Sequence, residues 1–462
     1  MPQLSATLLA ALSGRFGNRF STGESVCLHH GRDESSFAPM PPDAVVYAET
    51  SEEVQFVVRA CAAENIPIIA YGVGSSLEGH LLAVRGGVSL DLSGMNRVLS
   101  INPEDLSATV EPGVTRVALN NALKGTGLFF PIDPGADATI GGMTATRASG
   151  TNAVRYGTMR ENVLGLKAVL ANGEEIRTGS HARKSSAGYD LTRLFIGSEG
   201  TLGVISEITV RLYPVPEAIS AAVCNFPTVD DAVLCVIQTI QLGVPVARIE
   251  LLDSLAIRAI NAYSKLNMTE APTLFFEFHG SPAGVKEQAE TVKMLVGENG
   301  GNDFQWATRP EDRTRLWQAR HDAYFACLQL APGCRSLTTD VCVPISRLAE
   351  CIAGAQNDIA ASGLIAPILG HVGDGNFHVL MLAEPDHADE NARAAALSRA
   401  IVERALALGG TCTGEHGVGL GKQKYMTAEH GEPALNAMRA LKAALDPQNI
   451  MNPGKILPHA VE

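Results

Sequence analysis

Two histidines flank an Asp-Gly dipeptide in the segment GHVGDGNFH, residues 370–378. An Asp-Gly pair between apolar stretches is a strong signal for a two-residue hairpin turn. If Asp374 and Gly375 form this turn, His371 lies directly opposite His378, with the two Cβ atoms about 5 Å apart. Imidazoles at that distance can bind one metal ion, although a histidine of an isolated pair more often hydrogen-bonds to a backbone carbonyl. The hairpin alone leaves both alternatives open.

A third group that favours a metal comes from GEHGVG, residues 414–419, which places a carboxylate and an imidazole between glycines. Two imidazoles and the Glu415 carboxylate would hold a divalent ion, Zn²⁺ or Mn²⁺, and leave coordination positions for a substrate. His416 would then be available for proton chemistry. The spacing does not decide whether Glu415 or His416 is the third ligand. We predict a metal site at His371, His378 and Glu415.

A glycine-serine loop, YGVGSSLEGH at residues 71–80, follows the apolar strand PIIA. Its backbone amides could surround a pyrophosphate, and its glycines would permit close approach of that group. The dinucleotide fingerprint would need glycine where Leu77 stands, and the NTPase phosphate loop would need Lys followed by Ser or Thr at His80-Leu81. The loop therefore disfavours both a nicotinamide-type fold and an ordinary NTPase.

Two further small-residue segments occur in the same half of the chain, at residues 131–163 and 197–205. The first holds five glycines within a segment too apolar to be a linker, and the second is GSEGTLGVI. Tight loop packing would explain each segment singly. Together with the 71–80 loop, they predict a long cofactor bound in an extended form.

The elements that position these loops begin with residues 43–74, which read as a strand, a helix and a second strand. The helix is predicted to start at Thr50-Ser51, and its buried face to carry apolar residues at the spacing of one helical side. These residues are Val54, Val57, Val58 and Cys61. A second α/β region runs to about residue 213 and closes with a strand that ends at the prolines 214 and 216. That proline pair is the predicted domain boundary.

Beyond the boundary, the sequence predicts strands at 275–280 and 340–346 and a helix at 311–331, which suggests an α+β domain with antiparallel pairs. An Ala- and Leu-rich helix near the carboxyl terminus should stop at Asp446-Pro447. We predict a cofactor-binding domain at 1–215, a substrate domain at 216–410 and a segment at 411–462 that returns to the first domain.

The charge balance limits the partners, because 36 basic against 49 acidic residues give a formal charge of -13. Such a chain repels nucleic acid phosphates, so no nucleic acid partner is expected. Nine cysteines without a C-x-x-C pattern suggest free thiols. No apolar run approaches the roughly 20 residues of a membrane span. We expect a cytoplasmic protein, with loose attachment to the inner membrane left open.

Four motifs in order, YGVGSSLEG, PGADATIGG, ASGTNAVRYGT and IGSEGTLGVI, resemble the FAD-binding flavoproteins of the vanillyl-alcohol oxidase and p-cresol methylhydroxylase fold. The resemblance implies an α+β, two-domain FAD-binding fold with an antiparallel-sheet substrate domain. His80 is the nearest candidate for a covalent flavin tether, but noncovalent FAD is expected. The residues implied to contact FAD are Gly72, Val73, Gly74, Ser75, Ser76, Pro134, Gly135, Thr139, Gly142, Ser149, Gly150, Thr151, Tyr156, Gly157, Glu199, Gly203, Ile205 and Asn452.

Within this fold, HVGDGNFH, EHGVG and LDPQNIMNPGK resemble the D-2-hydroxy acid dehydrogenases, and WQARHDAYFACL with TTDVCVPISRL is most similar to the cytochrome-type D-lactate dehydrogenases. The resemblance covers nearly the whole chain from about residue 40. It implies the same three metal ligands, a catalytic base at His416 and a substrate-carboxylate arginine at Arg320. Flavin N5 would accept the hydride. The implied electron acceptor is a cytochrome c, a quinone or an electron-transfer flavoprotein.

The expected substrate is a small 2-hydroxy acid, D-lactate before the others, oxidised to pyruvate. The relatives that act on 2-hydroxyglutarate carry a basic residue where this chain has Thr338 and Thr339, which favours a monocarboxylate. The alternatives are a glycolate oxidase subunit, a D-2-hydroxyglutarate-type dehydrogenase, a non-catalytic flavin subunit that relays electrons, and a metal-dependent hydrolase whose glycine loops are structural. A homodimer is the candidate assembly.

Overall fold

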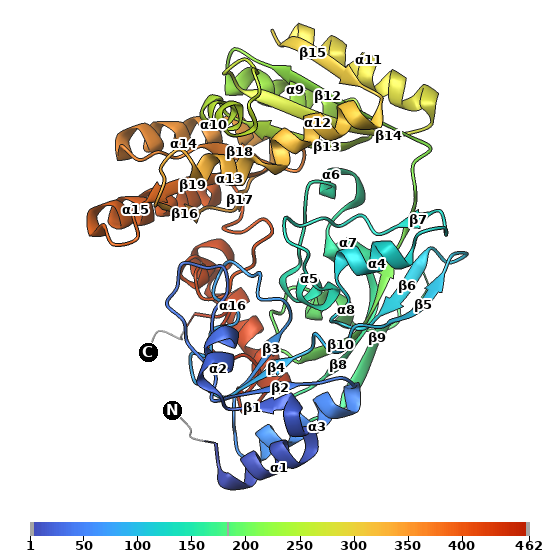
Figure 1. The fold of residues 1–462 in the computed structure, drawn as a ribbon, viewed down its shortest axis with the longest axis vertical. Helices are drawn as coiled ribbons and strands as arrows, with labels where there is room; N and C mark the ends of the chain where they lie inside the picture. Colours follow the sequence, from blue (N-terminus) through green and yellow to red (C-terminus); the bar gives the residue numbers. More distant parts are fainter. Residues whose placement is uncertain (1–3, 183, 459–462) are drawn as a thin grey trace. The chain divides into compact units, whose positions relative to one another are not determined.

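The computed structural model describes residues 4–182 and 184–458, which form two compact units (Figure 1). Unit 1 comprises Met1–Gly150, Gly157–Val215 and Glu415–Glu462, and unit 2 comprises Thr151–Tyr156 and Pro216–Gly414. Each unit is therefore assembled from separate stretches of sequence. The last stretch of unit 1 begins at Glu415, within the predicted metal motif.

Unit 1 contains eleven strands and eight α-helices among the residues described. The strands are β1 (Phe20–Ser21), β2 (Ala44–Tyr47), β3 (Ile68–Tyr71), β4 (Val88–Asp91), β5 (Val98–Asn102), β6 (Ser107–Val110), β7 (Leu128–Phe129), β8 (Val163–Val169), β9 (Glu175–Gly179), β10 (Val204–Arg211) and β11 (Tyr213–Pro214). The helices are α1 (Ala6–Phe16), α2 (Glu24–His30), α3 (Ser51–Ala63), α4 (Arg116–Ala122), α5 (Ile140–Thr146), α7 (Met159–Asn162), α8 (Leu191–Phe195) and α16 (Met426–Leu445), with 3₁₀ turns η1 (Gly17–Arg19) and η3 (Gln423–Tyr425).

The first sheet of unit 1 has the order β1-β2-β4-β3, with β2 and β3 each parallel to β4. The predicted strand, helix and strand over residues 43–74 are confirmed as β2, α3 and β3. The side chain of Thr50 caps α3 by accepting a hydrogen bond from the amide of Glu53, and the four predicted apolar residues of α3 are buried. The turn after β3 thus presents the glycine-serine loop at the carboxyl end of a parallel strand, where backbone amides can face a ligand.

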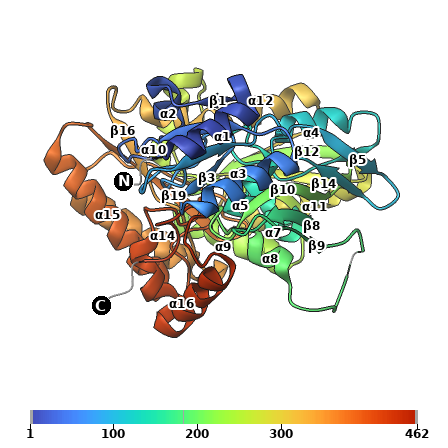
Figure 2. The same cartoon turned by 90° about the horizontal axis from the view of Figure 1, so that it is seen from below.

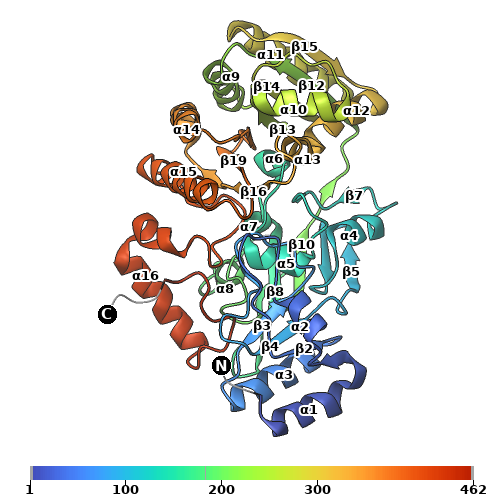
Figure 3. The same ribbon diagram turned by 60° about the vertical axis from the view of Figure 1, so that its left-hand side comes forward.

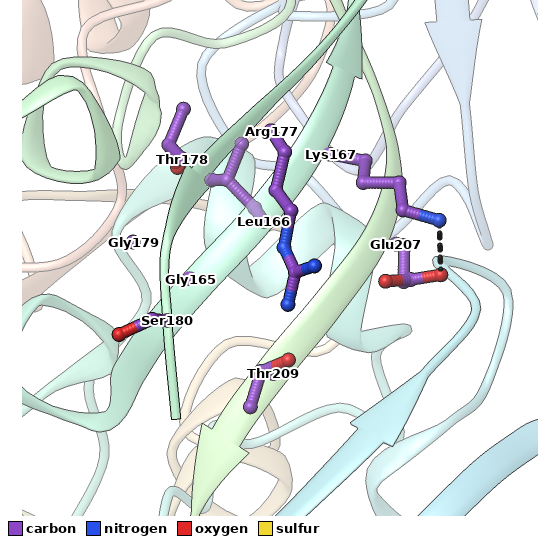
Figure 4. Close-up of a pocket in the computed structure, with 9 residues that line it drawn as sticks. All are labelled: Gly165, Leu166, Lys167, Arg177, Thr178, Gly179, Ser180, Glu207 and Thr209. Carbon is purple, nitrogen blue, oxygen red and sulfur yellow. Dashed lines mark hydrogen bonds and ion pairs between the residues drawn. The ribbon is translucent and has the colours of Figure 1, made fainter. Parts of the chain in front are cut away.

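The second sheet of unit 1 has the order β5-β6-β10-β8-β9 and is antiparallel throughout. Strand β10 is buried on both faces along most of its length, and only Glu207 and Arg211 are partly exposed. On β8 and β10, Lys167 and Glu207 form an ion pair of 2.9 Å at a shallow pocket (Figure 4).

Unit 2 is built on an eight-stranded sheet in the order β15-β12-β14-β13-β18-β19-β16, with β17 also paired to β19. The strands are β12 (Ala218–Asn225), β13 (Val246–Leu252), β14 (Thr273–Gly280), β15 (Asn302–Ala307), β16 (Arg335–Thr338), β17 (Val341–Cys342), β18 (Ile368–Gly370) and β19 (Asn376–Ala383). The helices are α6 (Ala153–Tyr156), α9 (Val229–Gln241), α10 (Ser254–Ser264), α11 (Pro282–Glu298), α12 (Pro310–His321), α13 (Ala323–Leu328), α14 (Leu348–Ser362) and α15 (Ala388–Ala407), with the 3₁₀ turn η2 (Ile345–Arg347).

Helices α10, α12 and α13 cover one face of this sheet and share an apolar core with Leu252 of β13 and Phe275 of β14. Helices α14 and α15 lie side by side (Figures 2 and 3). All strand pairs of unit 2 are antiparallel. The predicted α+β class and antiparallel substrate domain are therefore confirmed.

Two predicted elements of unit 2 need correction. The helix expected over residues 311–331 is broken at Asp322 into α12 and α13. The Asp322 amide donates to the carbonyls of Gln318 and Arg320 at the end of α12, and the same residue is the N-cap of α13. The strand expected over residues 340–346 is only the two-residue β17, since Pro344 has no amide hydrogen to donate and a 3₁₀ turn follows it. No helix in residues 4–182 and 184–458 has the length and apolar character needed to cross a membrane.

Asp253 gives a stability prediction that depends on pH. Its carboxylate caps α10 by accepting from the amide of Ala256 at 2.8 Å, and burial raises the pKa of Asp253 to about 6. A raised pKa means that ionisation of Asp253 opposes folding. The contribution of the protonated side chain to the free energy of unfolding is therefore complete below the unfolded pKa of about 3.9 and is lost as the pH rises through 6. The variant Asp253→Asn keeps an equivalent cap and should raise the free energy of unfolding by up to about 3 kcal/mol near neutral pH.

The gain should disappear near pH 4, as measured by urea unfolding of the two proteins at both pH values. Asp190→Asn is the matched control, because Asp190 caps α8 at an exposed position where its carboxylate stays hydrated. An equal gain at both pH values would contradict the assignment to ionisation.

Candidate active site

The predicted FAD loops lie in unit 1, and two of them approach each other closely. A Cβ atom at Gly72 would lie 2.7 Å from the Thr139 hydroxyl, which caps α5 by accepting from the amide of Gly142 at 3.2 Å. Gly74 has a φ of 78°, a conformation that favours glycine. The loop after β3 therefore packs on the start of α5 at Gly72, where a side chain would collide with Thr139.

These loops have the donors that a pyrophosphate needs. Within the described ranges 4–182 and 184–458, the backbone amides of residues 73–77 and 135–139 donate to no protein acceptor. Amides that converge without protein partners can bind phosphate oxygens. The residues present thus fit FAD, with Val73, Ser75, Ser76 and Gly135 among the candidate donors.

Other predicted FAD residues occupy supporting positions. A Cβ at Gly150 would lie 2.5 Å from the carbonyl oxygen of Asp133, so the loops at Pro134 and Ser149 also pack closely. Gly157 has a φ of 75°, and a Cβ at Gly203 would lie 2.8 Å from the carbonyl oxygen of Val169. Ile205 is buried in the core between β10 and β8. Only the backbones of Gly203 and Ile205 are therefore candidates for contact with a ligand.

Glu199, Asn452 and His80 form one buried cluster in unit 1. The Asn452 amide donates to the carbonyl oxygens of His80 at 3.1 Å and Glu199 at 2.8 Å. His80 Nε2 lies 3.3 Å from Glu199 Oε2. Burial would raise the pKa of Glu199, but the charge of His80 and hydrogen bonds from backbone amides hold it below its usual 4.5. The side chain of His80 thus faces a carboxylate.

Thr151 and Tyr156 belong to a short segment that is placed with unit 2 rather than unit 1. Helix α6 packs against β13, and the Tyr156 hydroxyl hydrogen-bonds to His279 Nδ1 at 2.7 Å. Asn152 accepts a hydrogen bond from Arg248 Nε at 2.9 Å. This part of the predicted FAD segment is therefore attached to the unit 2 sheet.

The hairpin at residues 370–378 differs from the prediction in register. Leu369, not His371, is the cross-strand partner of His378. The amide of Asn376 donates to the carbonyl of His371, so the turn contains four residues rather than the two of Asp374-Gly375. His371 and His378 are consequently diagonal neighbours, which remain within reach on one face of a sheet. Their ring centroids lie 5.5 Å apart, at an interplanar angle of 83°.

Both histidines are oriented through Nδ1. His371 Nδ1 lies 2.7 Å from Glu250 Oε1, and His378 Nδ1 lies 2.9 Å from the carbonyl oxygen of Thr339. Because both partners are acceptors, Nδ1 donates in each ring, and in a neutral imidazole Nε2 is then the nitrogen with a lone pair. Histidine ligands of metals are commonly held in this way by a carboxylate or a carbonyl. The geometry therefore fits a site that uses Nε2 of both histidines.

Arg320 is engaged by the same buried carboxylate as His371. Its Nε and Nη2 lie 2.9 and 2.7 Å from Glu250 Oε2. Burial would raise the pKa of Glu250, but His371 and Arg320 hold it below its usual 4.5. A substrate carboxylate would have to share the Arg320 guanidinium with Glu250, which the sequence did not indicate.

Glu415 and His416 open the last stretch of unit 1. His416 Nε2 lies 4.0 Å from Glu415 Oε1, and both side chains are mostly buried. Glu415 follows Gly414, whose amide donates to the carbonyl of Asp340 at 3.2 Å. Asp340 is fully buried, and its carboxylate lies 3.9 Å from His378 Nδ1. Asp340 is a candidate site residue that sequence reasoning missed, although it opens the strand predicted over residues 340–346.

A second missed group lies on β13 and β14. His279 Nε2 lies 2.8 Å from Glu277 Oε1, which is 3.5 Å from Arg248 Nε. With Tyr156, these residues form a buried Tyr-His-Glu series on the sheet face that also carries Glu250. The signal was present in FFEFHG, since Glu277 and His279 alternate in an apolar strand and must share a face.

Comparison with known proteins identifies the family. The model of FAD-linked oxidases, carboxyl-terminal domain, matches residues 215–456, and an FAD-binding domain model matches residues 42–179. The chain belongs to the FAD-linked oxidase family. It is 51% identical over 440 residues to a probable mitochondrial D-lactate dehydrogenase of Danio rerio, covering 95% of this chain and 88% of that one.

Two further relatives of this FAD-linked oxidase show the range of the family. It is 48% identical to a mitochondrial D-lactate dehydrogenase [cytochrome] of Arabidopsis thaliana, covering 99% of this chain and 81% of that one. It is 37% identical to the glycolate oxidase subunit GlcD of Bacillus subtilis, with coverages of 90% and 89%. The predicted membership of the FAD-dependent D-2-hydroxy acid dehydrogenases is confirmed, and the protein is an FAD-dependent enzyme that oxidises a hydroxy acid.

Solved structures confirm the fold of this FAD-linked oxidase. The substrate-bound structure of p-cresol methylhydroxylase matches with a TM-score of 0.81 at 19% identity, covering 97% of this chain and 96% of that one. A 4-ethylphenol oxidase from Gulosibacter chungangensis matches with a TM-score of 0.80 at 20% identity, covering 99% and 98%. At such identities the likeness concerns the fold alone.

The relatives correct the expected location. The predicted cytoplasmic location is wrong, because the D-lactate dehydrogenases at 41% to 51% identity are mitochondrial proteins. Free thiols and the lack of an apolar run long enough to span a membrane, on which the expectation rested, do not distinguish the two compartments.

Proposed function

We propose that this enzyme oxidises D-lactate to pyruvate, with FAD in unit 1 and a divalent ion held by His371, His378 and Glu415, and passes the electrons to a cytochrome. The observation that carries the metal role is the shared orientation of the two histidines, whose Nδ1 atoms are held by Glu250 and by the Thr339 carbonyl. The D-lactate dehydrogenases among the relatives support the substrate and the acceptor.

Glu415 is the proposed third ligand because Gly414, which precedes it in the chain, is hydrogen-bonded to the residue next to the one that orients His378. Asp340 and Thr339 are adjacent, and their carbonyl oxygens accept from the Gly414 amide and from His378, respectively. Glu415 is one peptide bond beyond Gly414, about 3.8 Å between Cα atoms. A carboxylate is also a ligand type that Zn²⁺ and Mn²⁺ both accept.

The reaction requires removal of a proton from the hydroxyl oxygen and of a hydride equivalent from the α-carbon. When bound, FAD supplies the two-electron oxidant, and a divalent ion makes a substrate hydroxyl more acidic. His416 accepts the hydroxyl proton as the general base. Arg320, fixed by Glu250, binds the substrate carboxylate and thereby sets which face of the α-carbon is presented for oxidation.

The polar neighbours of the histidines favour a monocarboxylate. Two oxygens of Thr339 already accept hydrogen bonds: the hydroxyl accepts from the amide of Val379, and the carbonyl accepts from His378. Thr338 lies at the end of β16. Neither threonine offers the positive charge that a second substrate carboxylate would need, which argues against 2-hydroxyglutarate.

Anaerobic mixing with a substrate panel tests the proposal. D-lactate should bleach the visible flavin absorbance fastest, followed by other aliphatic D-2-hydroxy acids, and L-lactate should not bleach it. Glycolate is the second candidate substrate, because the GlcD relative covers nearly the same length of chain. Faster bleaching by glycolate than by D-lactate would reassign the enzyme, and bleaching by none of the panel would reject the proposed chemistry.

A further inference from the structure

Glu199 is a buried carboxylate with an unusual set of partners, all within unit 1. Its Oε1 accepts from the amide of Val418 at 2.7 Å, and its Oε2 accepts from the amide of Gly419 at 2.9 Å. The side chain is only 2% exposed, and His80 lies 3.3 Å away as its counter-ion. The residue itself has a positive φ of 52°. Two backbone amides and the adjacent His80 thus stabilise a carboxylate that is removed from water.

The two amides belong to the chain immediately after the proposed ligand and base. Val418 is two residues after His416 and three after Glu415. Between them, Gly417 has a φ of 82°, and a Cβ atom there would lie 2.8 Å from both Glu199 Oε1 and His80 Nε2. The loop thus contacts the ion pair so closely that only glycine fits.

The following residues are attached to the next part of the glycine-serine loop. The amides of Leu420 and Gly421 donate to the carbonyl oxygen of Glu78 at 2.7 and 3.2 Å. The Glu78 carboxylate lies 3.1 Å from Lys422 Nζ. Residues 417–422 are therefore fixed along their length to residues 78–80 and to Glu199, which leaves the segment little conformational freedom.

We infer that Glu199, with His80 as its counter-ion, is a positioning residue that holds the Glu415-His416 segment in the geometry needed to bind the divalent ion. This inference rests on the proposed role of Glu415 as a ligand. It replaces the role in flavin binding that the sequence suggested for the Glu199 side chain, because both carboxylate oxygens already accept hydrogen bonds from the loop. Ligands held by such outer partners commonly lose 10- to 100-fold in metal affinity when the partner is removed.

The variant Glu199→Gln tests the inference in the FAD-loaded enzyme. A glutamine can accept from one amide only, because its NH₂ group would face the other amide hydrogen. We expect Mn²⁺, followed by the electron paramagnetic resonance of the free ion, to bind about 10- to 100-fold more weakly. The FAD content and the flavin spectrum should be unchanged, and excess Mn²⁺ should restore turnover. Restoration by excess metal would not occur if the variant were merely misfolded.

Glu207→Gln is the matched control, because it makes the same substitution in unit 1 at the ion pair with Lys167 of β8 (Figure 4) and not at a contact with residues 417–422. It should bind Mn²⁺ as the wild type does. If Glu199→Gln fails to fold, Gly417→Ala tests the contact from the loop side, since its Cβ would displace both Glu199 and His80. It should weaken Mn²⁺ binding while FAD stays bound.

The remaining outcomes separate this inference from the proposed function. Unchanged Mn²⁺ affinity in a folded Glu199→Gln or Gly417→Ala variant overturns the positioning role, and so does loss of FAD with normal Mn²⁺ affinity. If the wild-type holoenzyme binds no Mn²⁺ or Zn²⁺, the inference falls because the proposed metal role has failed, and that measurement comes first.

Discussion

Replacing His416 by alanine should lower kcat by about 10²- to 10⁴-fold, the usual contribution of a general base. The residue follows Glu415 directly, and its Nε2 lies 4.0 Å from the Glu415 carboxylate. KM should change little, because the imidazole is proposed to take the hydroxyl proton and not to bind the carboxylate. Stopped-flow measurement of flavin reduction by D-lactate gives the limiting rate of reduction and the substrate dissociation constant, which should change in the same way, without a contribution from the electron acceptor.

His430→Ala is the matched control for this measurement, since His430 lies on α16 of the same unit and its side chain is partly exposed. It should reduce its flavin at the wild-type rate. A His416→Ala enzyme that kept wild-type turnover would remove the base role, and the buried His279 would become the next residue to test.

Removing the divalent ion should abolish flavin reduction while FAD stays bound, because the glycine loops and the histidine pair belong to different units. Dialysis against a chelator, followed by titration with Zn²⁺ or Mn²⁺, should eliminate and then restore bleaching by D-lactate. The variant His378→Ala should lose the metal at ordinary concentrations and lower the reduction rate at least as much as His416→Ala, since it removes a proposed ligand.

The control for His378→Ala is His387→Ala, which removes a histidine from the start of α15 in the same unit. That variant should lose helix stability but retain the metal. Metal-free enzyme that reduced its flavin at the full rate would contradict the metal role outright, whatever the variants showed.

Local patterns predicted the parts of this molecule that depend on local forces. The capped helix α3 and its flanking strands follow from the spacing of apolar residues, and the glycine loops follow from their composition. The Asp-Gly signal correctly predicted that His371 and His378 are neighbours, but it predicted the wrong register for the two strands. A turn two residues longer changed the partner of His378 to Leu369, yet diagonal residues on one face still meet.

The partners that orient the site could not be predicted, because tertiary structure alone brings them there. Glu250 lies 121 residues before His371 in the chain and is hidden in an apolar strand. The pairing of β13 with β18 creates their contact, and strand pairing over such distances leaves no local signal. The same is true of Glu199, whose partners Val418 and Gly419 contribute only backbone amides, so no side-chain pattern could reveal them.

The discontinuity of unit 1 has a consequence for how the enzyme is made. During synthesis, all of unit 2 emerges from the ribosome before Glu415, and domains tend to fold as soon as their sequence is complete. The histidine pair can therefore be assembled while the cofactor unit still lacks α16 and the segment that carries the proposed base. A chain truncated after Gly414 should contain a folded substrate sheet but no competent catalyst, so that activity appears only once Glu415 and the stretch with α16 have been added.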